Sequence, residues 1–460
     1  MRRFARIPLL AISGLLVLVG VFSLTPAMTH AQQTTPSAAS EHQDKQVVGY
    51  YTQWSIYGAN FFIHNLVTSG TAGKLTTLIY AFGNISPDLQ CFEVNQAGQG
   101  DAWADYQRPF PSDQSVNGVA DSWGQPLAGN FYQLKELKAL YPHLKILISL
   151  GGWTWSAHFS DAALPQNREA FVQSCINQYI LGNLPQLDGD PSGGPGAAAG
   201  IFDGFDIDWE YPAVPGNVGN VVRPEDTQNF TGLLATFRHQ LDTLGKSTGK
   251  QYLLTAATSS GQDKYSKLEL GKIGRYLDWA NVLTYDMHGA WDVNGPTDVL
   301  APLFADPRDP STPPSNTYSI NHAVRDYIAA GFPASKIVLG MAIYGRGWTN
   351  VPDNNRGLYQ SSPDMQPAPG SLGAGVENFS VLETLSGYTS YRDWLTQGHW
   401  IFNGTTFWSF DDPTAIAAKM LYVRMLGLGG AYAWSLDGDD ASGTFMTAIY
   451  NGLAGGHPER

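Results

Sequence analysis

Four acidic residues stand close together in the segment FDGFDIDWEYP, residues 202–212. Three of them, Asp206, Asp208 and Glu210, alternate with bulky apolar residues. Residues two apart share one face of a strand, so the alternation predicts a buried strand with a row of carboxyl groups along one face. Such a row cannot be fully ionised, so the pKa of at least one member should be raised. A carboxylic acid that keeps its proton near neutral pH can act as the general acid in glycosidic bond cleavage.

Metal binding is the alternative use of clustered acids. Histidines with ligand spacing are missing near this row, and carboxylates on one strand form an incomplete cage. We therefore predict no metal and no cofactor. A solvated acidic loop is a weaker alternative, because it gives no reason for apolar residues to alternate so regularly with the acids.

Composition limits the classes of partner. The 460-residue chain is 43% hydrophobic and only 15% charged, which is typical of a folded globular protein. Its net charge of −13 argues against nucleic acid and anionic membrane surfaces as partners. Aromatic residues make up 12%, and the flat rings of Trp and Tyr suit stacking on sugars, although some must serve the core.

Eight short apolar runs alternate with segments of helical spacing. They cover residues 47–51, 75–82, 145–153, 202–210, 252–260, 280–289, 336–345 and 429–438. This alternation predicts an α/β fold, a (β/α)₈ TIM barrel. An open doubly wound sheet is the alternative, but no Gly-rich phosphate-binding turn follows the first run. Residues 349–410 are too many for a loop, so we expect a small α+β insertion between strand 7 and helix 7.

The N-terminus has the features of a secretory signal peptide. Three arginines precede an apolar run at 7–24, and small residues follow it. We expect a signal peptide at 1–31, a flexible leader at 32–46 and the catalytic barrel at 47–455, in a secreted, extracellular protein. An uncleaved membrane anchor is the alternative. Export would permit a disulfide between Cys91 and Cys175, but the sequence alone does not show that it forms.

Several motifs together resemble one known family. The acidic segment Asp203 to Glu210 resembles the DxxDxDxE signature of glycoside hydrolase family 18, the chitinases and their relatives. Four further elements of that family occur in order on the expected strands: Ser149-Leu150-Gly151-Gly152-Trp153, Thr284-Tyr285-Asp286, Tyr344-Gly345-Arg346 and Trp434. The expected insertion is similar to that of the family's deep-cleft subgroup.

The resemblance implies a retaining mechanism in which the substrate's own N-acetyl carbonyl attacks the anomeric carbon. Glu210 would protonate the leaving oxygen. Asp208 would hold the acetamido N–H and stabilise the cationic intermediate, and Asp206 would share a proton with Asp208. Tyr285 would hydrogen-bond the acetamido oxygen.

The resemblance also implies further roles. It assigns substrate binding to Trp434, Asp286, Trp153, Trp291, Tyr344, Arg346, Tyr50 and Phe82; for Tyr50 and Phe82 ordinary packing is an equal alternative. Structural support is expected from Asp203, Ser149, Gly151 and Gly152. We expect His288 to be a satisfied structural histidine. Leu283 stands where many relatives have Met, so the resemblance does not define the wall of the acetamido pocket.

The function expected from the resemblance is that of a secreted, monomeric chitinase acting on β-1,4-linked N-acetylglucosamine polymers or their oligosaccharides. One alternative is an endo-β-N-acetylglucosaminidase acting on N-glycans; the insertion and the tryptophans favour chitin. The other is a non-catalytic chitin-binding lectin, which would be expected to lack the acid at Glu210.

Overall fold

The computed structural model describes residues 45–455. The expected signal peptide, and all of the expected leader except Lys45 and Gln46, lie outside these residues. In the described part of the chain, none of the helices combines the length and the apolar character needed to cross a membrane.

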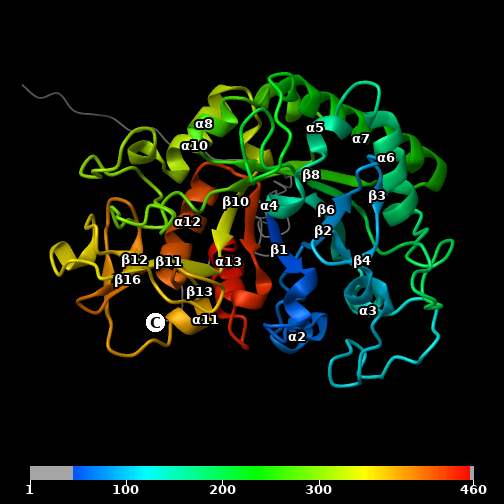
Figure 1. Cartoon of the computed structure of the whole chain (residues 1–460), viewed down its shortest axis with the longest axis horizontal. Coiled ribbons are helices and arrows are strands. Elements are labelled where there is room, and N and C mark those ends of the chain that lie inside the picture. The colour runs from blue at the N-terminus through cyan, green and yellow to red at the C-terminus, as the bar shows by residue number, and fades with distance from the viewer. Residues whose placement is uncertain (1–44, 456–460) are drawn as a thin grey trace, which may run out of the picture. The chain divides into compact units, whose positions relative to one another are not determined.

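Eight parallel strands form a closed barrel within residues 45–455 (Figure 1). β1 pairs with both β2 and β17, which closes the ring and confirms the expected TIM barrel. The barrel strands are β1 (Gln46–Thr52), β2 (Thr77–Ile85), β6 (Lys145–Gly151), β7 (Gly204–Asp208), β8 (Leu253–Ser259), β9 (Trp279–Leu283), β10 (Ile337–Ala342) and β17 (Gly430–Trp434).

Helices follow the barrel strands and pack on their outer faces. The longer ones are α2 (Ile63–Thr68), α3 (Gly129–Leu140), α6 (Arg168–Cys175), α7 (Asp226–Thr248), α10 (Ile320–Ala329), α12 (Pro413–Met425) and α13 (Thr444–Leu453). One-turn helices are α4 (Gly152–Trp155), α5 (Phe159–Ala162), α8 (Gln262–Tyr265), α9 (Leu270–Ile273) and α11 (Phe379–Leu382). Local sequence explains several ends: the Asp412 carboxylate accepts the Ala415 N–H at the start of α12, and Gly249 ends α7 in the left-handed conformation.

Side chains on β7 divide between two environments. Phe205 and Ile207 are fully buried in the outer core between the strands and the helices. Because successive side chains on a strand point to opposite faces, Asp206 and Asp208 face the barrel interior. The predicted alternation is therefore correct, although the strand itself ends at Asp208.

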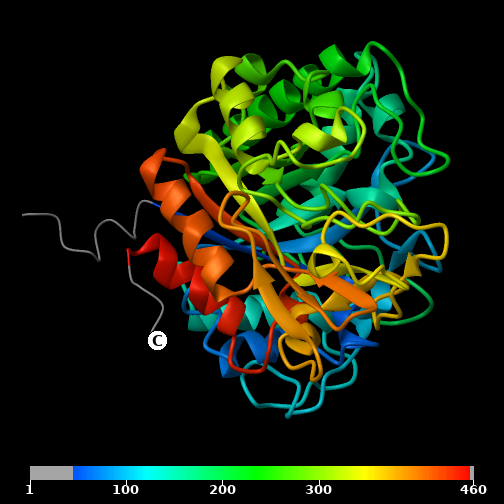
Figure 2. The ribbon, with the colours of Figure 1, turned by 90° about the vertical axis from the view of Figure 1, so that its left-hand side faces the viewer.

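The expected insertion is an antiparallel sheet whose strands come after β10 and before α12 along the chain (Figures 1 and 2). Its strands are β11 (Tyr344–Thr349), β12 (Gln366–Pro367), β13 (Val376–Asn378), β14 (Thr389–Arg392), β15 (His399–Phe402) and β16 (Thr406–Ser409). A separate aromatic core around Trp348 supports it. The expected barrel run 336–345 was too long: β10 ends at Ala342, and Tyr344 begins the first strand of the insertion.

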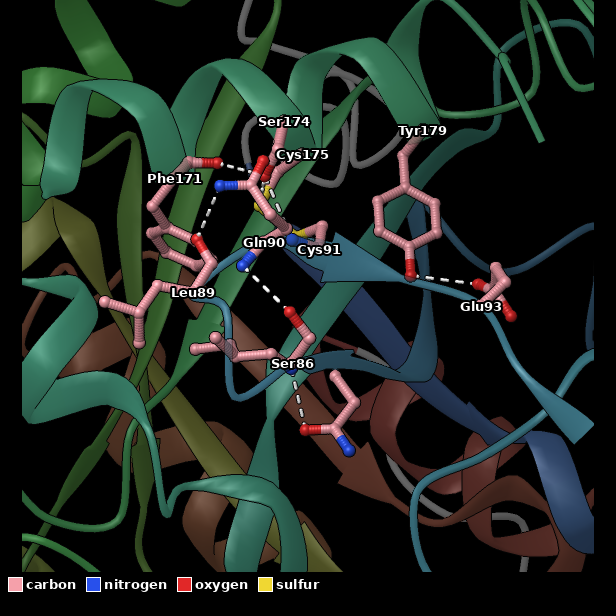
Figure 3. The surroundings of a disulfide bond; sticks show 11 residues. Ser86, Leu89, Gln90, Cys91, Glu93, Phe171, Ser174, Cys175 and Tyr179 are labelled. Carbon is pink, nitrogen blue, oxygen red and sulfur yellow. Dashed lines mark hydrogen bonds between the residues drawn. A yellow bond between two sulfur atoms is a disulfide. The ribbon is translucent and has the colours of Figure 1, made fainter. Parts of the chain in front are cut away.

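A disulfide joins Cys91 to Cys175, the pair that the sequence left open (Figure 3). Cys91 begins β3 (Cys91–Phe92), which pairs with the end of β2, and Cys175 ends α6. The Cys91 N–H also donates to the Ser174 hydroxyl at 2.9 Å. The bridge thus fixes the segment after β2 to a helix 84 positions further along the chain. A small hairpin, β4 (Asn95–Gln96) with β5 (Gly100–Asp101), follows β3.

Candidate active site

Asp206 lies at the centre of a hydrogen-bond network inside the barrel. One carboxylate oxygen accepts the hydroxyls of Tyr50 and Ser149, each at 2.8 Å. The other accepts the Thr255 hydroxyl at 2.6 Å and the Asn281 amide at 3.1 Å. Burial raises the pKa of Asp206, and these hydrogen bonds partly oppose the rise. Donors from four different strands therefore hold this carboxyl in one orientation.

Asp208 is also buried, but its surroundings differ. Its Oδ1 atom finds no hydrogen-bond partner among residues 45–455. Burial raises its pKa well above the ordinary value, and the charges of Glu210 and Asp206 raise it further. No hydrogen bond joins Asp208 to Asp206 within these residues, so proton sharing between them stays a prediction. Asp208 nevertheless offers a buried acceptor whose bonding capacity is unused.

Glu210 follows the end of β7 and is partly exposed. Burial raises its pKa to about 7; the nearby charge of Asp286 also raises it, while the Tyr211 hydrogen bond and Lys264 lower it. The backbone of Glu210 is held on both sides: its N–H donates to the Ser156 hydroxyl at 2.9 Å, and its carbonyl accepts the Asn220 amide at 2.9 Å. About half of this carboxyl is therefore protonated at neutral pH, and it lies just beyond the end of the strand.

Two glycines, the last residue of β6 and the first of α4, allow close approaches to the acid-bearing strand and to an aromatic side chain. Gly151 and Gly152 have φ values of +102° and +71°, which L side chains rarely adopt. A Cβ atom on Gly151 would lie 2.5 Å from the Asp208 carbonyl oxygen, and one on Gly152 would lie 2.5 Å from the Phe82 ring. Larger residues would displace either the catalytic strand or an aromatic wall, which agrees with the supporting role expected of both glycines.

Aromatic rings surround the acid row. Trp434, at the end of β17, stacks on Phe82 with ring centroids 5.5 Å apart and contacts Tyr50 edge-on at 5.4 Å. The Tyr432 hydroxyl donates to the Tyr285 hydroxyl at 3.2 Å. Tyr285 stands two residues after β9 and packs in one buried cluster with Tyr50 and Tyr432. Tyr50 in turn donates its hydroxyl to Asp206. Tyr50 is part of the carboxyl network, so the packing-only interpretation is wrong for it.

A second charged group connects the barrel to the insertion. Asp286 accepts two hydrogen bonds from Arg346, at 2.9 and 2.6 Å, and one from the Tyr344 hydroxyl at 2.9 Å. The Arg346 guanidinium lies 5.2 Å from the ring centres of Trp291 and Tyr344. Four of the expected binding residues are therefore in direct contact, although two of them come from the insertion.

Two expected residues are separate from the acid row. Trp153, on α4, is 51% exposed and makes no ring contact within residues 45–455. Asp203 lies at the opposite end of β7, where it forms an ion pair with Lys138 at 2.7 Å and accepts the Ile146 N–H at 2.9 Å. This position matches the structural role expected of Asp203 and places it away from the reacting groups.

Several contributors were missed by sequence reasoning. Thr255 and Asn281 each supply a donor to Asp206, and Ser156 positions the backbone of Glu210. Thr255 and Asn281 are polar residues inside apolar runs, a signal that could have identified them. Ser156 had no such signal. His288, expected to be a satisfied structural histidine, has its Nε2 atom 3.6 Å from the Asp298 carboxylate, within ion-pair distance.

Comparison with known proteins gives a consistent result. The profile of glycosyl hydrolases family 18 matches residues 46–439. Chitinase 63 of Streptomyces plicatus is 39% identical over 412 residues, which cover 88% of this chain but only 60% of that protein. The solved catalytic domain of psychrophilic chitinase B from Arthrobacter TAD20 is 41% identical, with a TM-score of 0.85 over 91% of this chain and 97% of that one.

A family 18 N-acetylglucosaminidase from Paenibacillus barengoltzii has a similar structure. It is 29% identical, with a TM-score of 0.66, and the match covers 89% of this chain and all of that one (100%). The profile covers most of the chain and includes the acid row, both glycines and the aromatic residues around them. The chain belongs to glycosyl hydrolases family 18.

Proposed function

We propose that this protein is a chitinase that hydrolyses β-1,4 links between N-acetylglucosamine units. The observation that carries the proposal is the row of Asp206, Asp208 and Glu210, in which burial raises the pKa of the outermost acid to about 7. The chitinases among its relatives support chitin as the substrate class. We further propose that the protein is secreted, on the basis of its N-terminal sequence, and that it acts as a monomer, because the barrel closes within one chain.

The proton of Glu210 goes to the glycosidic oxygen as the bond to the leaving sugar breaks. The acetamido carbonyl oxygen of the substrate forms the new bond to the anomeric carbon, giving a cyclic cationic intermediate. The unpaired Oδ1 of Asp208 is the natural acceptor for the acetamido N–H and the counter-charge for the intermediate. Water then attacks the same carbon, the bond from that carbon to the acetamido oxygen breaks, and Glu210 takes the proton that the water loses. The configuration at this carbon is therefore retained.

The surrounding groups support these steps. Tyr285 donates its hydroxyl to the acetamido oxygen, which directs that oxygen toward the anomeric carbon. Its burial keeps the pKa of the phenol well above the ordinary value, so it remains a donor. The Trp434 ring provides an apolar surface for the reacting sugar. Four donors fix the Asp206 carboxyl in one position. Its charge therefore acts on Asp208 from a constant position and helps to raise the pKa of Asp208.

A substrate panel tests the proposal. Chitin oligosaccharides labelled at one end should be cut, whereas fully deacetylated chitosan and cellulose should not, since neither carries the attacking carbonyl. A stable thiazoline analogue of the cyclic intermediate should inhibit competitively. Release of intact glycans from an N-glycoprotein without cleavage of chitin oligosaccharides would favour the endo-β-N-acetylglucosaminidase. Binding of chitin oligosaccharides without any cleavage would favour a lectin, and cleavage of cellulose would refute the mechanism.

A further inference from the structure

Three potential metal ligands meet in the segment after β9, outside the acid row. His288, Asp298 and Asp309 each direct one donor atom into a group whose members lie within 4.8 Å of one another. His288 is 5% exposed and Asp298 is 3% exposed, while Asp309 is partly exposed. The mechanism proposed above uses none of the three.

Hydrogen bonding does not explain this arrangement. The His288 Nε2 atom lies 3.6 Å from Asp298 Oδ2, which is too long for a hydrogen bond. Within the described residues, the imidazole makes no hydrogen bond, and its polar neighbours are the two carboxylates of the cluster. Two donors bound to one tetrahedral metal at about 2.0–2.1 Å would lie about 3.4 Å apart, close to the observed spacing.

The balance of charges around the three residues also indicates a bound cation. Arg308, the residue before Asp309, is already bound to Asp306 at 2.6 Å and to Asp393 at 2.5 Å. Asp306 also accepts the Tyr359 hydroxyl at 2.8 Å. Asp298 and Asp309 therefore face a His without any arginine or lysine partner among the described residues. A divalent cation would compensate both carboxylates and give the buried imidazole a ligand role.

We infer that His288, Asp298 and Asp309 bind one divalent transition metal ion of the Zn²⁺ type. An imidazole with two carboxylates is a donor set that suits such ions better than Ca²⁺ or Mg²⁺, which prefer oxygen alone. The partial exposure of Asp309 leaves room for water to complete the coordination. Its Oδ1 atom accepts the Ser311 N–H at 2.8 Å, which orients the carboxylate.

The ion would stabilise a segment on which the active site depends. His288 stands two residues after Asp286, and the same segment contains Trp291. The neighbouring ion pair between Arg308 and Asp393 ties this segment to the insertion. The ion is therefore structural, fixing the loop that carries Asp286 without contacting the substrate.

Metal binding by the untagged, chelator-treated full-length secreted protein provides the test. Titration with ZnCl₂, followed by calorimetry and elemental analysis, should show one equivalent bound and a melting temperature raised by about 2–4 °C. CaCl₂ and MgCl₂ should bind at least tenfold more weakly. Asp309→Asn keeps the oxygen that accepts from Ser311 but removes the charge, so its Zn²⁺ affinity should fall at least tenfold. His288→Gln should do the same.

Asp353→Asn is the matched control, since this exposed aspartate lies in the insertion and outside the cluster. It should bind Zn²⁺ as the unmodified protein does. Absence of stoichiometric Zn²⁺ binding would overturn the inference, as would equal affinity of Asp309→Asn and the control. Tighter binding of Ca²⁺ than of Zn²⁺ would overturn the assigned class of metal. None of these readouts depends on chitin hydrolysis, so failure here is distinguishable from failure of the proposed function.

Discussion

The proton on Glu210 should control the alkaline limit of activity. A general acid works only in its protonated form, so activity is present below its pKa and is lost as the pH rises through that value. With a pKa of about 7, the protonated fraction is about nine-tenths at pH 6 and about one-tenth at pH 8. The value of kcat/KM should therefore fall about tenfold between these two pH values.

Glu210→Gln preserves the shape of the side chain but removes the proton. Its activity at pH 6 should fall about 10²–10⁴-fold, the usual contribution of general acid catalysis. Binding of chitin oligosaccharides should persist, because the aromatic residues around the row are unchanged. The assay combines a pH–rate profile with a fluorogenic chitin oligosaccharide and a calorimetric titration with an unlabelled one.

Asp203→Asn is the control, because it also converts an acid to an amide at the other end of β7. It should retain the alkaline limb near pH 7 while melting at a lower temperature, since its ion pair with Lys138 is lost. The reasoning would be refuted if Glu210→Gln kept most of the activity. It would also fail if the unmodified protein were equally active at pH 6 and pH 8.

Three further outcomes are expected. Replacing Cys91 and Cys175 together with Ser should lower the free energy of unfolding by about 2–4 kcal/mol in a denaturant titration, because the bridge spans 84 positions; unchanged stability would contradict this. Ser156→Ala leaves the backbone N–H of Glu210 unpaired, which should lower the free energy of unfolding by about 1–3 kcal/mol. It should also reduce kcat more than it changes KM. A change in KM alone would argue against the positioning role of Ser156. The double variant of Asp206→Asn with Asp208→Asn should lose far less activity than the product of the two single losses, and strictly multiplicative losses would show that the two acids act independently.

Much of the fold could be predicted from local sequence. The eight apolar runs correspond to the eight barrel strands, and the alternation in 204–208 correctly assigned carboxyls to one face and aromatic packing to the other. These features depend on neighbouring residues only, because strand pleating and helical periodicity act over a few positions. The boundaries were less accurate, since Tyr344 belongs to the insertion and Glu210 lies beyond its strand.

The environment of each acid was decided by tertiary structure. Thr255 and Asn281 meet Asp206 only because β8 and β9 lie beside β7 in the closed barrel. The raised pKa of Glu210 likewise requires burial and the charge of Asp286 from another strand's end. Local spacing can place three carboxyls on one face. The donors and charges that distinguish these carboxyls come from distant parts of the chain, and only barrel closure brings those parts together.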